Sequence, residues 1–491
     1  MTFPILSVII FSPLVGALIL LLMPAERKTE IRVVALMTAT FALILSLWVY
    51  IQYLTLDMTG YQFIEKYSWM PQLGISLHLG VDGISTPLLL LTGVVMFTGV
   101  IISWGIDDRP REFFAFLFLL ASGVFGVFVA LDLFMLFFFY EIAVFPMYLL
   151  IAIWGWVKTR EYAAMKLTLY LFIGSVVALV GALAMYFESG MGTFNMLMLE
   201  TANFSPEFQK IWFLPVFLGF AVLGGIWPFH NWSPDGHVAA PTAVSMFHAG
   251  VLMKLGAFAA LRVGIMLLPV GAQYWSWLIL AFATVNVVYG AFIAMTQNDL
   301  KYMIGFSSVS HMGLVVLGFA TLTKDGMTGA GVQMFSHGVM TALFFAAVGM
   351  VYDRAHTRQI PELGGMIKPL PFVGITFIIG GLVSMGMPGF SGFVAEFPIF
   401  MGVWQVVPWV AILAVISIVI TAAYIMLAIR RTFFGEMPKE LEGHITPISV
   451  MDKVALAMLS ALMIGLGVFP QIMVPMVATG VENVLRLLGG A

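Results

Sequence analysis

Four ionisable side chains lie inside long apolar stretches of this sequence: Glu141, Lys254, His337 and Glu396. A charge at the centre of a membrane-spanning helix costs about 2.5–3.5 kcal/mol on insertion scales, so such residues persist when they are paired, hydrated or useful. Carboxylate, amine and imidazole groups that share an apolar interior alter each other's proton affinity and can pass protons along. These residue types in these positions therefore indicate proton movement within a membrane.

The sequence around three of these residues favours deep placement. Nothing near Glu141 in the chain can neutralise it, and Pro146 frees a backbone carbonyl about one turn earlier. A lysine as deep in an apolar run as Lys254 trades a proton readily. Glu396 lies seven residues beyond a Pro-Gly break at 387–389. Each residue has an alternative interpretation. Glu141 could be an interfacial or protonated structural glutamate, and Lys254 could extend to the membrane surface. Glu396 could cap the second half of its helix.

Histidines extend the set of candidates, because imidazole titrates near neutral pH and suits a relay. His337 has Gln333 one turn earlier on the same helical face. The polar segment 231–236 is flanked by two histidines, and we expect it to be a loop that lines a path for water. A hydrogen-bonded structural histidine is the alternative at each position. The candidate histidines are His230, His237, His248, His311 and His337.

Composition excludes several classes of protein. Of 491 residues, 61% are hydrophobic and 10% charged, whereas soluble domains are about 45–50% apolar and about 25% charged. A net charge of −3 gives a nucleic-acid partner no electrostatic support. The absence of cysteine excludes disulfides and cysteine-ligated iron–sulfur clusters from this chain. No nucleophile elbow, phosphate loop or metal-ligand motif is present, so we expect no cofactor here.

Apolar runs of about 20 residues predict membrane-spanning helices. The short seventh run leads into Trp227–Pro228, and the twelfth run contains the break 387–389. Proline and glycine interrupt the helical hydrogen bonds there, so we predict two discontinuous helices. The fold class is therefore an all-α polytopic membrane protein. The fourteen predicted spans are 4–23, 31–54, 81–104, 113–130, 132–153, 163–187, 211–225, 241–267, 274–296, 302–320, 328–351, 370–404, 408–429 and 454–470.

Charge in the loops predicts the orientation of these spans. Of 22 lysines and arginines, 16 fall in loops that follow odd-numbered spans and 5 on the other side, while Lys254 lies within a span. Positively charged loops stay in the cytoplasm. We therefore predict a multi-pass protein of the bacterial inner (cell) membrane, with both termini on the non-cytoplasmic side.

Helices four to eight and nine to thirteen form two similar sets, each with its broken helix in fourth place. An odd number of helices in each set requires inverted repeats, which are typical of transporters. The predicted domains are 1–112, with helices one to three and an outer loop; 113–267 and 274–431, the two repeats; and 432–491, with a cytoplasmic loop, helix fourteen and the tail. Segment 55–80 is predicted to be a polar outer loop, and segment 471–489 an amphipathic surface helix.

Several motifs resemble the proton-conducting, antiporter-like subunits of respiratory complex I. The resemblance runs from about residue 79 to about residue 435 and is narrowed to the subunit M (subunit 4) type by the last two motifs. The motifs are 228–237 (PFHNWSPDGH), 240–243 (APTA), 298–302 (NDLKY), 308–313 (SVSHMG), 352–358 (YDRAHTR) and 79–85 (LGVDGIS).

The resemblance implies a 14-helix subunit whose proton path uses a glutamate in helix five, lysines in helices seven and eight, and a glutamate in helix twelve. Glu141, Lys254 and Glu396 match three of these positions, and His337 matches a central histidine of helix eleven. The family's helix-seven lysine falls on Leu223. The sequence therefore departs from the family at the expected cation partner of Glu141.

A histidine could replace that cation. Related larger subunits carry a histidine at the place of His248, so one hypothesis is that His248 is the partner of Glu141. The alternative is a partly degenerate subunit that conducts poorly.

The resemblance implies a proton-translocating membrane-arm subunit of a complex I-type NADH–quinone oxidoreductase, an enzyme only as part of that complex. NADH, FMN, iron–sulfur clusters and quinone are expected on other subunits, and the expected partners are the L and N types of antiporter-like subunit and the lipid bilayer. Two alternatives remain: a subunit of a multi-subunit sodium/proton antiporter or membrane-bound hydrogenase, and a non-conducting structural subunit of the membrane arm.

Overall fold

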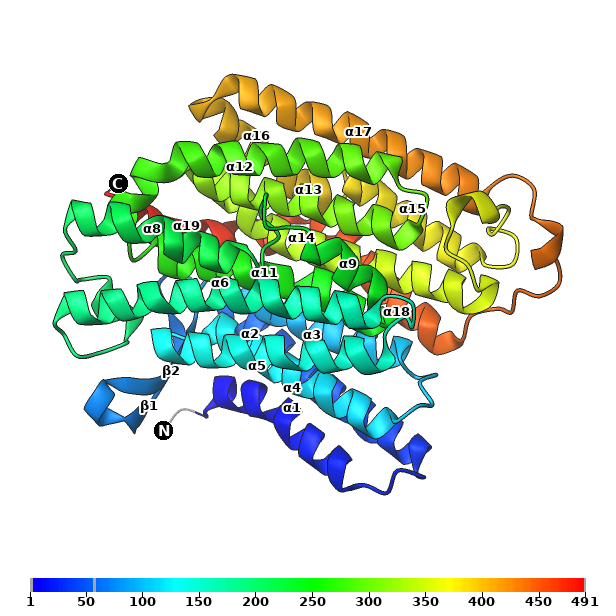
Figure 1. Ribbon diagram of the computed structural model, residues 1–491, viewed down its shortest axis with the longest axis horizontal. Coiled ribbons are helices and arrows are strands. Elements are labelled where there is room, and N and C mark those ends of the chain that lie inside the picture. Colours follow the sequence, from blue (N-terminus) through cyan, green and yellow to red (C-terminus); the bar gives the residue numbers. More distant parts are fainter. Residues whose placement is uncertain (1–2, 56–58, 490–491) are drawn as a thin grey trace.

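The computed structural model describes residues 3–55 and 59–489 as a bundle of roughly parallel helices (Figure 1). Within those residues, twelve helices are long and apolar enough to cross a membrane. A helix satisfies its backbone polar groups internally, which hydrocarbon surroundings require. The all-helical prediction for the spans is therefore confirmed.

The long helices match the predicted spans to within a few residues. Eleven of them are uninterrupted: α1 (Ile5–Leu22), α2 (Lys28–Thr55), α3 (Ser85–Ile102), α4 (Pro110–Val129), α5 (Leu133–Trp154), α6 (Arg160–Ser189), α12 (Pro269–Thr296), α13 (Leu300–Ala320), α14 (Lys324–Ala355), α17 (Pro408–Phe433) and α18 (Val450–Val468).

The twelfth long helix changes its winding along its length. It consists of α10 (Thr242–Phe247), the π-helical turn η2 (His248–Leu252), α11 (Met253–Ala259) and the π-helical turn η3 (Ala260–Ile265). π-Helical turns are rare and often occur at functional sites. In this helix, His248 begins the turn η2, and Lys254 lies in α11 just after it.

Two further apolar segments are each divided into two shorter helices. The first consists of α8 (Pro206–Ala221) and α9 (Trp232–Ala239), the second of α15 (Pro371–Ser384) and α16 (Ser391–Val406). Both breaks occur where proline and glycine predicted them. The prediction of a loop over 231–236 was wrong, because that segment forms most of α9. Its proline, Pro234, lies in the first turn of the helix, where no backbone N–H is required.

Local sequence explains where several helices begin. Proline starts α4, α8, α12, α15 and α17, because its fixed φ suits the first helical position. The Asp132 carboxylate accepts backbone N–H bonds from Phe134 and Met135 at the start of α5. Asp299 does the same for Lys301 and Tyr302 at the start of α13.

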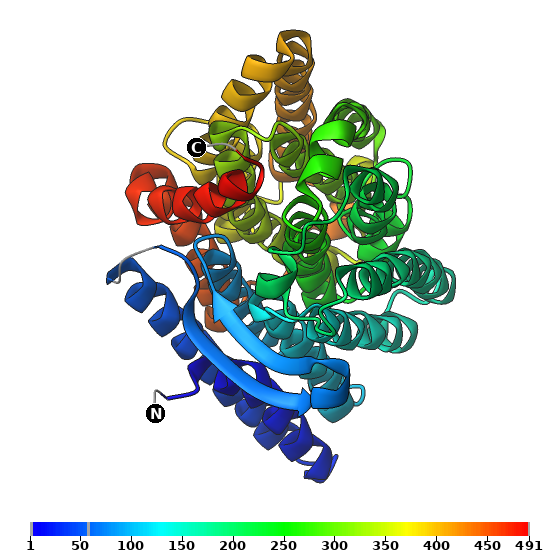
Figure 2. The ribbon, with the colours of Figure 1, turned by 90° about the vertical axis from the view of Figure 1, so that its left-hand side faces the viewer.

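One end of the bundle is covered by elements that lie across it (Figure 2). The predicted outer loop 55–80 contains an antiparallel hairpin of β1 (Gln62–Met70) and β2 (Ile75–Val81), joined by a short 3₁₀ turn, η1 (Pro71–Leu73). The alternating pattern of the segment escaped the sequence analysis, which gave no strand here. Glu65 of β1 accepts N–H bonds from Leu6 and Ser7 and so fixes the hairpin to the start of α1.

The tail forms α19 (Val474–Leu487) and confirms the predicted amphipathic helix. Its buried face includes Met476, Val477 and Val481. The remaining elements are short: α7 (Met196–Leu199), and the 3₁₀ turns η4 (Ile360–Glu362), η5 (Lys439–Leu441) and η6 (Pro470–Ile472).

The most buried helices lie at the centre of the bundle. The apolar middle of α14 and the segment Thr242–Ile265 are wholly buried, and those of α3 and α13 nearly so, whereas most residues in the apolar stretches of α1, α2 and α18 are at least partly exposed. The candidate residues Lys254, His311 and His337 all lie on central helices. The fold therefore keeps these polar groups away from lipid.

Candidate proton path

Four predicted residues form one buried series that crosses from the segment Thr242–Ile265 to α16. The Lys254 ammonium donates to the backbone carbonyl of Ala249 and lies 2.8 Å from Nδ1 of His337. The His337 ring stacks on His311, with ring centroids 5.4 Å apart. Nε2 of His311 lies 3.5 Å from Oε1 of Glu396. The structure therefore brings an amine, two imidazoles and a carboxylate together in the core.

The surroundings of Glu396 are polar although the residue is only 2% exposed. Gln333, on the same face of α14 as His337, donates to Oε1 of Glu396 at 3.2 Å. The other carboxylate oxygen, Oε2, has no hydrogen-bond partner among the described residues. The capping interpretation of Glu396 is not supported, since Phe390 is the N-cap of α16 and Glu396 faces the interior.

His311 has contacts that suit the doubly protonated ring. Its Nδ1 lies 2.8 Å from the carbonyl of Ser307, and its Nε2 lies 3.2 Å from the carbonyl of Ser384. A carbonyl oxygen only accepts, and neutral imidazole has a single N–H to donate. A doubly protonated ring would donate to both carbonyls and would also face the Glu396 carboxylate. This arrangement can hold an excess proton between His311 and Glu396.

A second group consists of two histidines, His237 near the end of α9 and His248 directly after α10. The rings of His237 and His248 lie 4.3 Å apart, and both side chains are fully buried. Nε2 of His237 bonds the Ser233 hydroxyl at 2.9 Å, while Trp232 packs on the His248 ring. Nδ1 of His237 and both ring nitrogens of His248 have no hydrogen-bond partner in the described ranges.

His230 lies apart from both groups. It is buried against the ring of Tyr289, and neither ring nitrogen has a hydrogen-bond partner among residues 3–55 and 59–489. The structure therefore does not place His230 in contact with the other candidates, and its role stays a prediction.

Glu141 is exposed on the surface of this chain rather than buried in the bundle. Its carboxylate faces the Ser175 hydroxyl of α6, and its neighbours one turn before and one turn after, Phe138 and Phe145, are also exposed. The direct ion pair with His248 does not form, since neither nitrogen of His248 has a hydrogen-bond partner in the described residues. Coupling between them over a longer distance stays a prediction.

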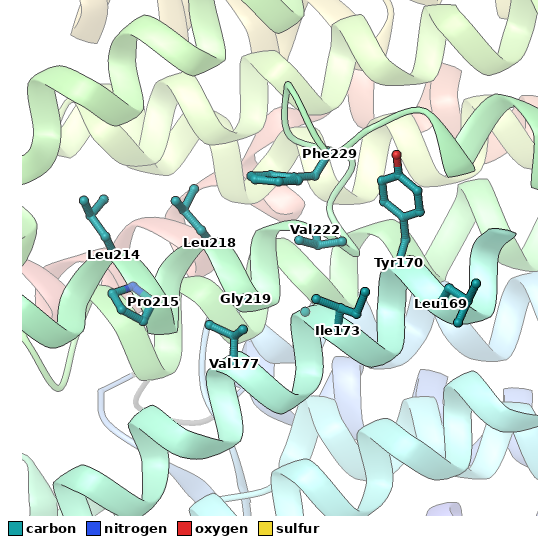
Figure 3. A pocket seen from close by; sticks show the side chains of 11 residues that line it. Leu169, Tyr170, Ile173, Val177, Leu214, Pro215, Leu218, Gly219, Val222 and Phe229 are labelled. Carbon is teal, nitrogen blue, oxygen red and sulfur yellow. The ribbon is translucent and has the colours of Figure 1, made fainter.

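Leu223, at the family's lysine position, is fully buried beside the break between α8 and α9. A groove of about 730 Å³ lies next to this break, between α6 and α8; Figure 3 shows side chains that line it. Its lining is apolar and includes Ile173, Val222 and Phe229. The lining offers no carboxylate, amine or imidazole, so the groove supplies no replacement for the missing lysine.

The break itself is held by a residue that the sequence analysis missed. Asn286 of α12 is fully buried; its side-chain oxygen accepts from the Trp227 N–H, and its amide nitrogen donates to the carbonyl of Gly225 at 2.9 Å. The same nitrogen lies 3.2 Å from the carbonyl of Val309 on α13. A lone asparagine inside the apolar run 274–296 was the signal that could have found it.

An ion pair lies outside this path, near the hairpin. Nη2 of Arg262 lies 2.5 Å from Oδ1 of Asp82, and both side chains are buried. Burial alone would raise the pKa of the Asp82 carboxyl, but the Arg262 guanidinium and its hydrogen bonds hold that pKa below its usual value. The pair joins the loop after β2 to the end of the segment Thr242–Ile265.

Comparison with known proteins places this geometry in a family. Residues 130–421 match the family model described as NADH:quinone oxidoreductase/Mrp antiporter, transmembrane. The chain belongs to this family. NADH-quinone oxidoreductase subunit M of Rhodobacter capsulatus is 36% identical over 98% of this chain and 96% of its own length. NAD(P)H-quinone oxidoreductase chain 4 of Gloeobacter violaceus is 35% identical over 99% of this chain and 93% of its own length. The resemblance seen in the sequence is thereby confirmed.

Solved structures agree with this assignment. A chain of respiratory complex I from Thermus thermophilus superposes with a TM-score of 0.90 at 28% identity and covers 99% of this chain and all of its own. A chain of the Mrp complex from a Dietzia species superposes with a TM-score of 0.87 at 20% identity over the full length of both. The second likeness shows the shared fold alone. This family member is thus a multi-pass membrane protein.

Proposed function

We propose that this chain is a proton-translocating subunit in the membrane arm of an NADH–quinone oxidoreductase of the complex I type. The buried series Lys254–His337–His311–Glu396 is the observation that carries the proposal. Its relatives of similar length are named as subunits of that enzyme. In this proposal NADH, FMN, iron–sulfur clusters and quinone reside on other subunits, and this chain supplies only the path for protons.

The geometry suggests how one proton advances. The Lys254 ammonium can give a proton to Nδ1 of His337, which is at hydrogen-bond distance. The stacked rings of His337 and His311 do not bond each other, so water must bridge this step. His311 then faces Glu396 across 3.5 Å. Because each transfer moves a positive charge past its neighbours, loading one end of the series favours release at the other.

The fourteen-helix topology belongs to the same proposal. Twelve long helices and the two interrupted segments, α8–α9 and α15–α16, together make fourteen crossings. Inverted repeats are supported by a local feature that the second helix of each repeat shares. Asp132, just before α5, forms an isolated backbone β-bridge with Asn195, and Asp299, just before α13, forms one with Gln359. With cytoplasmic loops after odd-numbered crossings, both termini lie on the opposite side of the membrane.

We further propose that a neighbouring membrane-arm subunit, of the L or N type, covers Glu141. An exposed carboxylate between Phe138 and Phe145 would otherwise face lipid, at a cost of about 2.5–3.5 kcal/mol at the helix centre. Coverage by a partner supplies polar groups instead. Coupling from Glu141 to the histidine pair then requires hydrogen-bonded water.

The proposal is tested by proton-to-electron stoichiometry of the whole complex in proteoliposomes. Glu396→Gln keeps the shape of the side chain but removes the titrating group, so it should abolish the share of pumping that passes through this subunit. Glu482→Gln, on the surface of α19 in an exposed pair with Lys324, is the matched control. An unchanged ratio in both Glu396→Gln and Lys254→Ala would contradict the proposed function.

Two observations favour the alternatives. The fold of the Mrp complex is nearly the same, so a sodium/proton antiporter subunit is the second candidate, and co-purified quinone-site and iron–sulfur subunits would exclude it. Leu223 in place of the lysine favours a non-conducting structural subunit. That alternative predicts normal stoichiometry when Glu396 is neutralised.

A further inference from the structure

A polar cavity of about 350 Å³ lies outside the series just described. It opens between the last residues of α3 and α5, the start of α13 and the end of α14. Its polar lining includes Lys301, Tyr352, Asp353 and Arg358. These residues come from two family motifs, 298–302 and 352–358, to which the proton path assigns no role.

The floor of the cavity is the unwound junction between α9 and α10. Helix α9 ends at Ala239 and α10 begins at Thr242, because Pro241 cannot continue the helical hydrogen bonding. The freed carbonyl of Val238 accepts from Nη1 of Arg358 at 3.2 Å. The carbonyl of Ala240 accepts from the Lys301 ammonium at 2.9 Å. Two buried cations therefore replace the lost helical bonds.

Of these two cations, Arg358 is fixed. Its Nε lies 2.6 Å from Oδ2 of Asp299, and its guanidinium stacks on the Trp156 ring at 4.4 Å from the centroid. Arginine does not deprotonate in proteins. Arg358 is therefore a permanent charge that shapes the cavity and cannot carry a proton through it.

Lys301 is different. The residue is only 5% exposed, and its ammonium bonds one backbone carbonyl, which leaves N–H groups for further partners. A buried lysine, unlike arginine, can give up its proton. The charged and titratable groups around it are Arg358 and Asp299 beside it, Asp353 at the exposed end of the cavity, and His237 on the inner side. Lys301 therefore stands between an exposed carboxylate and a buried imidazole.

The inner side leads directly to the histidine pair. His237 immediately precedes Val238 of the cavity floor, and its Nδ1 has no hydrogen-bond partner in the described residues. Its ring lies 4.3 Å from that of His248. The His237 carbonyl, like that of Ala240, accepts from the Ser245 hydroxyl, which ties the junction to α10.

We propose that this cavity is the port through which the pair His237–His248 exchanges protons with water, and that Lys301 transfers each proton across it. The inference rests on the proposed function and names the side chain that loads the buried path. One N–H bond of the Lys301 ammonium breaks, and the proton crosses by hydrogen-bonded water to the free Nδ1 of His237. The neutral amine then takes a proton from hydronium in the cavity, which becomes water, and the Asp353 carboxylate favours that step by attracting hydronium.

The absence of native cysteine makes the port directly testable. In the assembled complex, Thr242→Cys places a thiol on the cavity wall, and Leu169→Cys places one in the exposed apolar groove of α6. A positively charged, membrane-impermeant methanethiosulfonate is added to one side of proteoliposomes, and the mass of this chain is measured. We expect modification of Thr242→Cys from the cytoplasmic side only, with loss of this subunit's proton transfer, and no modification of Leu169→Cys.

Two lysine variants separate proton transfer from support of the junction. Lys301→Met removes both, whereas Lys301→Arg keeps a cation on the Ala240 carbonyl but cannot release its proton. We expect both variants to lower the proton-to-electron ratio to that of Glu396→Gln, while the assembled complex still reduces quinone. A proton-to-electron ratio in Lys301→Arg equal to that of the unmutated complex would show that Lys301 only supports the junction, and would overturn the transfer step.

The outcomes distinguish this inference from the function on which it rests. If Glu396→Gln lowers the ratio but Thr242→Cys remains unmodified and Lys301→Met pumps normally, the port is wrong and the proposed function stands. If neither Glu396→Gln nor Lys254→Ala changes the ratio, the proposed function fails and the port fails with it.

Discussion

The two interrupted helical segments both leave backbone polar groups inside the bundle, and different side chains line the two breaks. At the break between α8 and α9, the neutral amide of Asn286 satisfies the backbone, and the residue at the family's charged position is Leu223. At the break between α15 and α16, Ser391 bonds Ser336, and Glu396 lies beside Gln333 and His311. A broken helix in a membrane therefore needs polar partners but not charge. Charge is a separate requirement, and in this chain only the second break meets it.

The predicted repeats, 113–267 and 274–431, are called here the first and second halves, and titratable groups are also distributed unequally between them. Lys254 contacts His337 on α14, in the second half, and not Glu141 in its own half. Glu141 faces outward instead. The titratable series of this chain thus belongs mainly to the second half, and the first half contributes one amine and the histidine pair.

The largest expected effect concerns the charged break. Glu396→Gln should remove all proton transfer through this subunit, because the neutral amide cannot exchange a proton with His311. The measurement is the proton-to-electron ratio in proteoliposomes at matched rates of quinone reduction. A ratio equal to that of the Glu482→Gln control would mean that the second break carries no protons.

The two aspartates that begin α5 and α13 offer the next test, because only Asp299 is paired with arginine. Asp299→Ala should leave the buried Arg358 guanidinium without its carboxylate, and breaking a buried pair in this way costs about 3–5 kcal/mol. Thermal unfolding of the purified complex, followed by release of this subunit, measures the loss. Stability equal to that of the unmutated complex would show that Asp299 does not balance Arg358.

Asn286→Leu should destabilise the first break. It leaves the Trp227 N–H and the Gly225 carbonyl without partners, at about 1–3 kcal/mol for each buried group. The matched control is Thr284→Val on the same helix, where the hydroxyl bonds only the carbonyl of Leu280 within the helix. If the two variants unfold at the same temperature, Asn286 does not hold the break.

Leu223→Lys tests whether the first half conducts protons when the lysine of related subunits is restored. The position is fully buried, Glu141 lies on the surface, and the adjacent groove is apolar. We therefore expect a modest loss of stability and no rise in the proton-to-electron ratio. A higher ratio would show that the first half conducts once its lysine is restored, and would remove the contrast between the halves.

The smallest effect is expected at Asp132, which has no cation. Burial raises the pKa of this carboxyl, although N–H bonds from Ser76, Met135 and Phe134 act in the opposite direction. A raised pKa in the folded state means that ionisation disfavours folding, so the contribution to stability is present at low pH and is lost as pH rises through the folded-state pKa. Asp132→Asn should remove this dependence. Thermal unfolding between pH 4 and 8 tests it, and an unaltered pH profile would contradict the assignment.

Much of this protein could be predicted from local sequence. The long helices, both breaks and the amphipathic tail follow from apolar runs, from prolines and glycines, and from one-sided patterning, since each is a property of neighbouring residues. The hairpin at 62–81 was missed because its alternation is short and irregular. The helix α9 was missed because Pro234 and Gly236 were taken as loop signals, although a proline in the first helical turn is tolerated.

The sequence by itself determined that a lysine, histidines and glutamates occur within membrane-spanning runs, because hydrocarbon makes such residues conspicuous. Only the tertiary structure decided which of them meet. Lys254, His311, His337 and Glu396 come from four different helices, and their contacts depend on helix rotation and crossing. The same packing turned Glu141 outward and gave Asn286 and Lys301 their partners. A contact between distant segments is a property of how helices pack, and no residue's neighbours in the chain specify it.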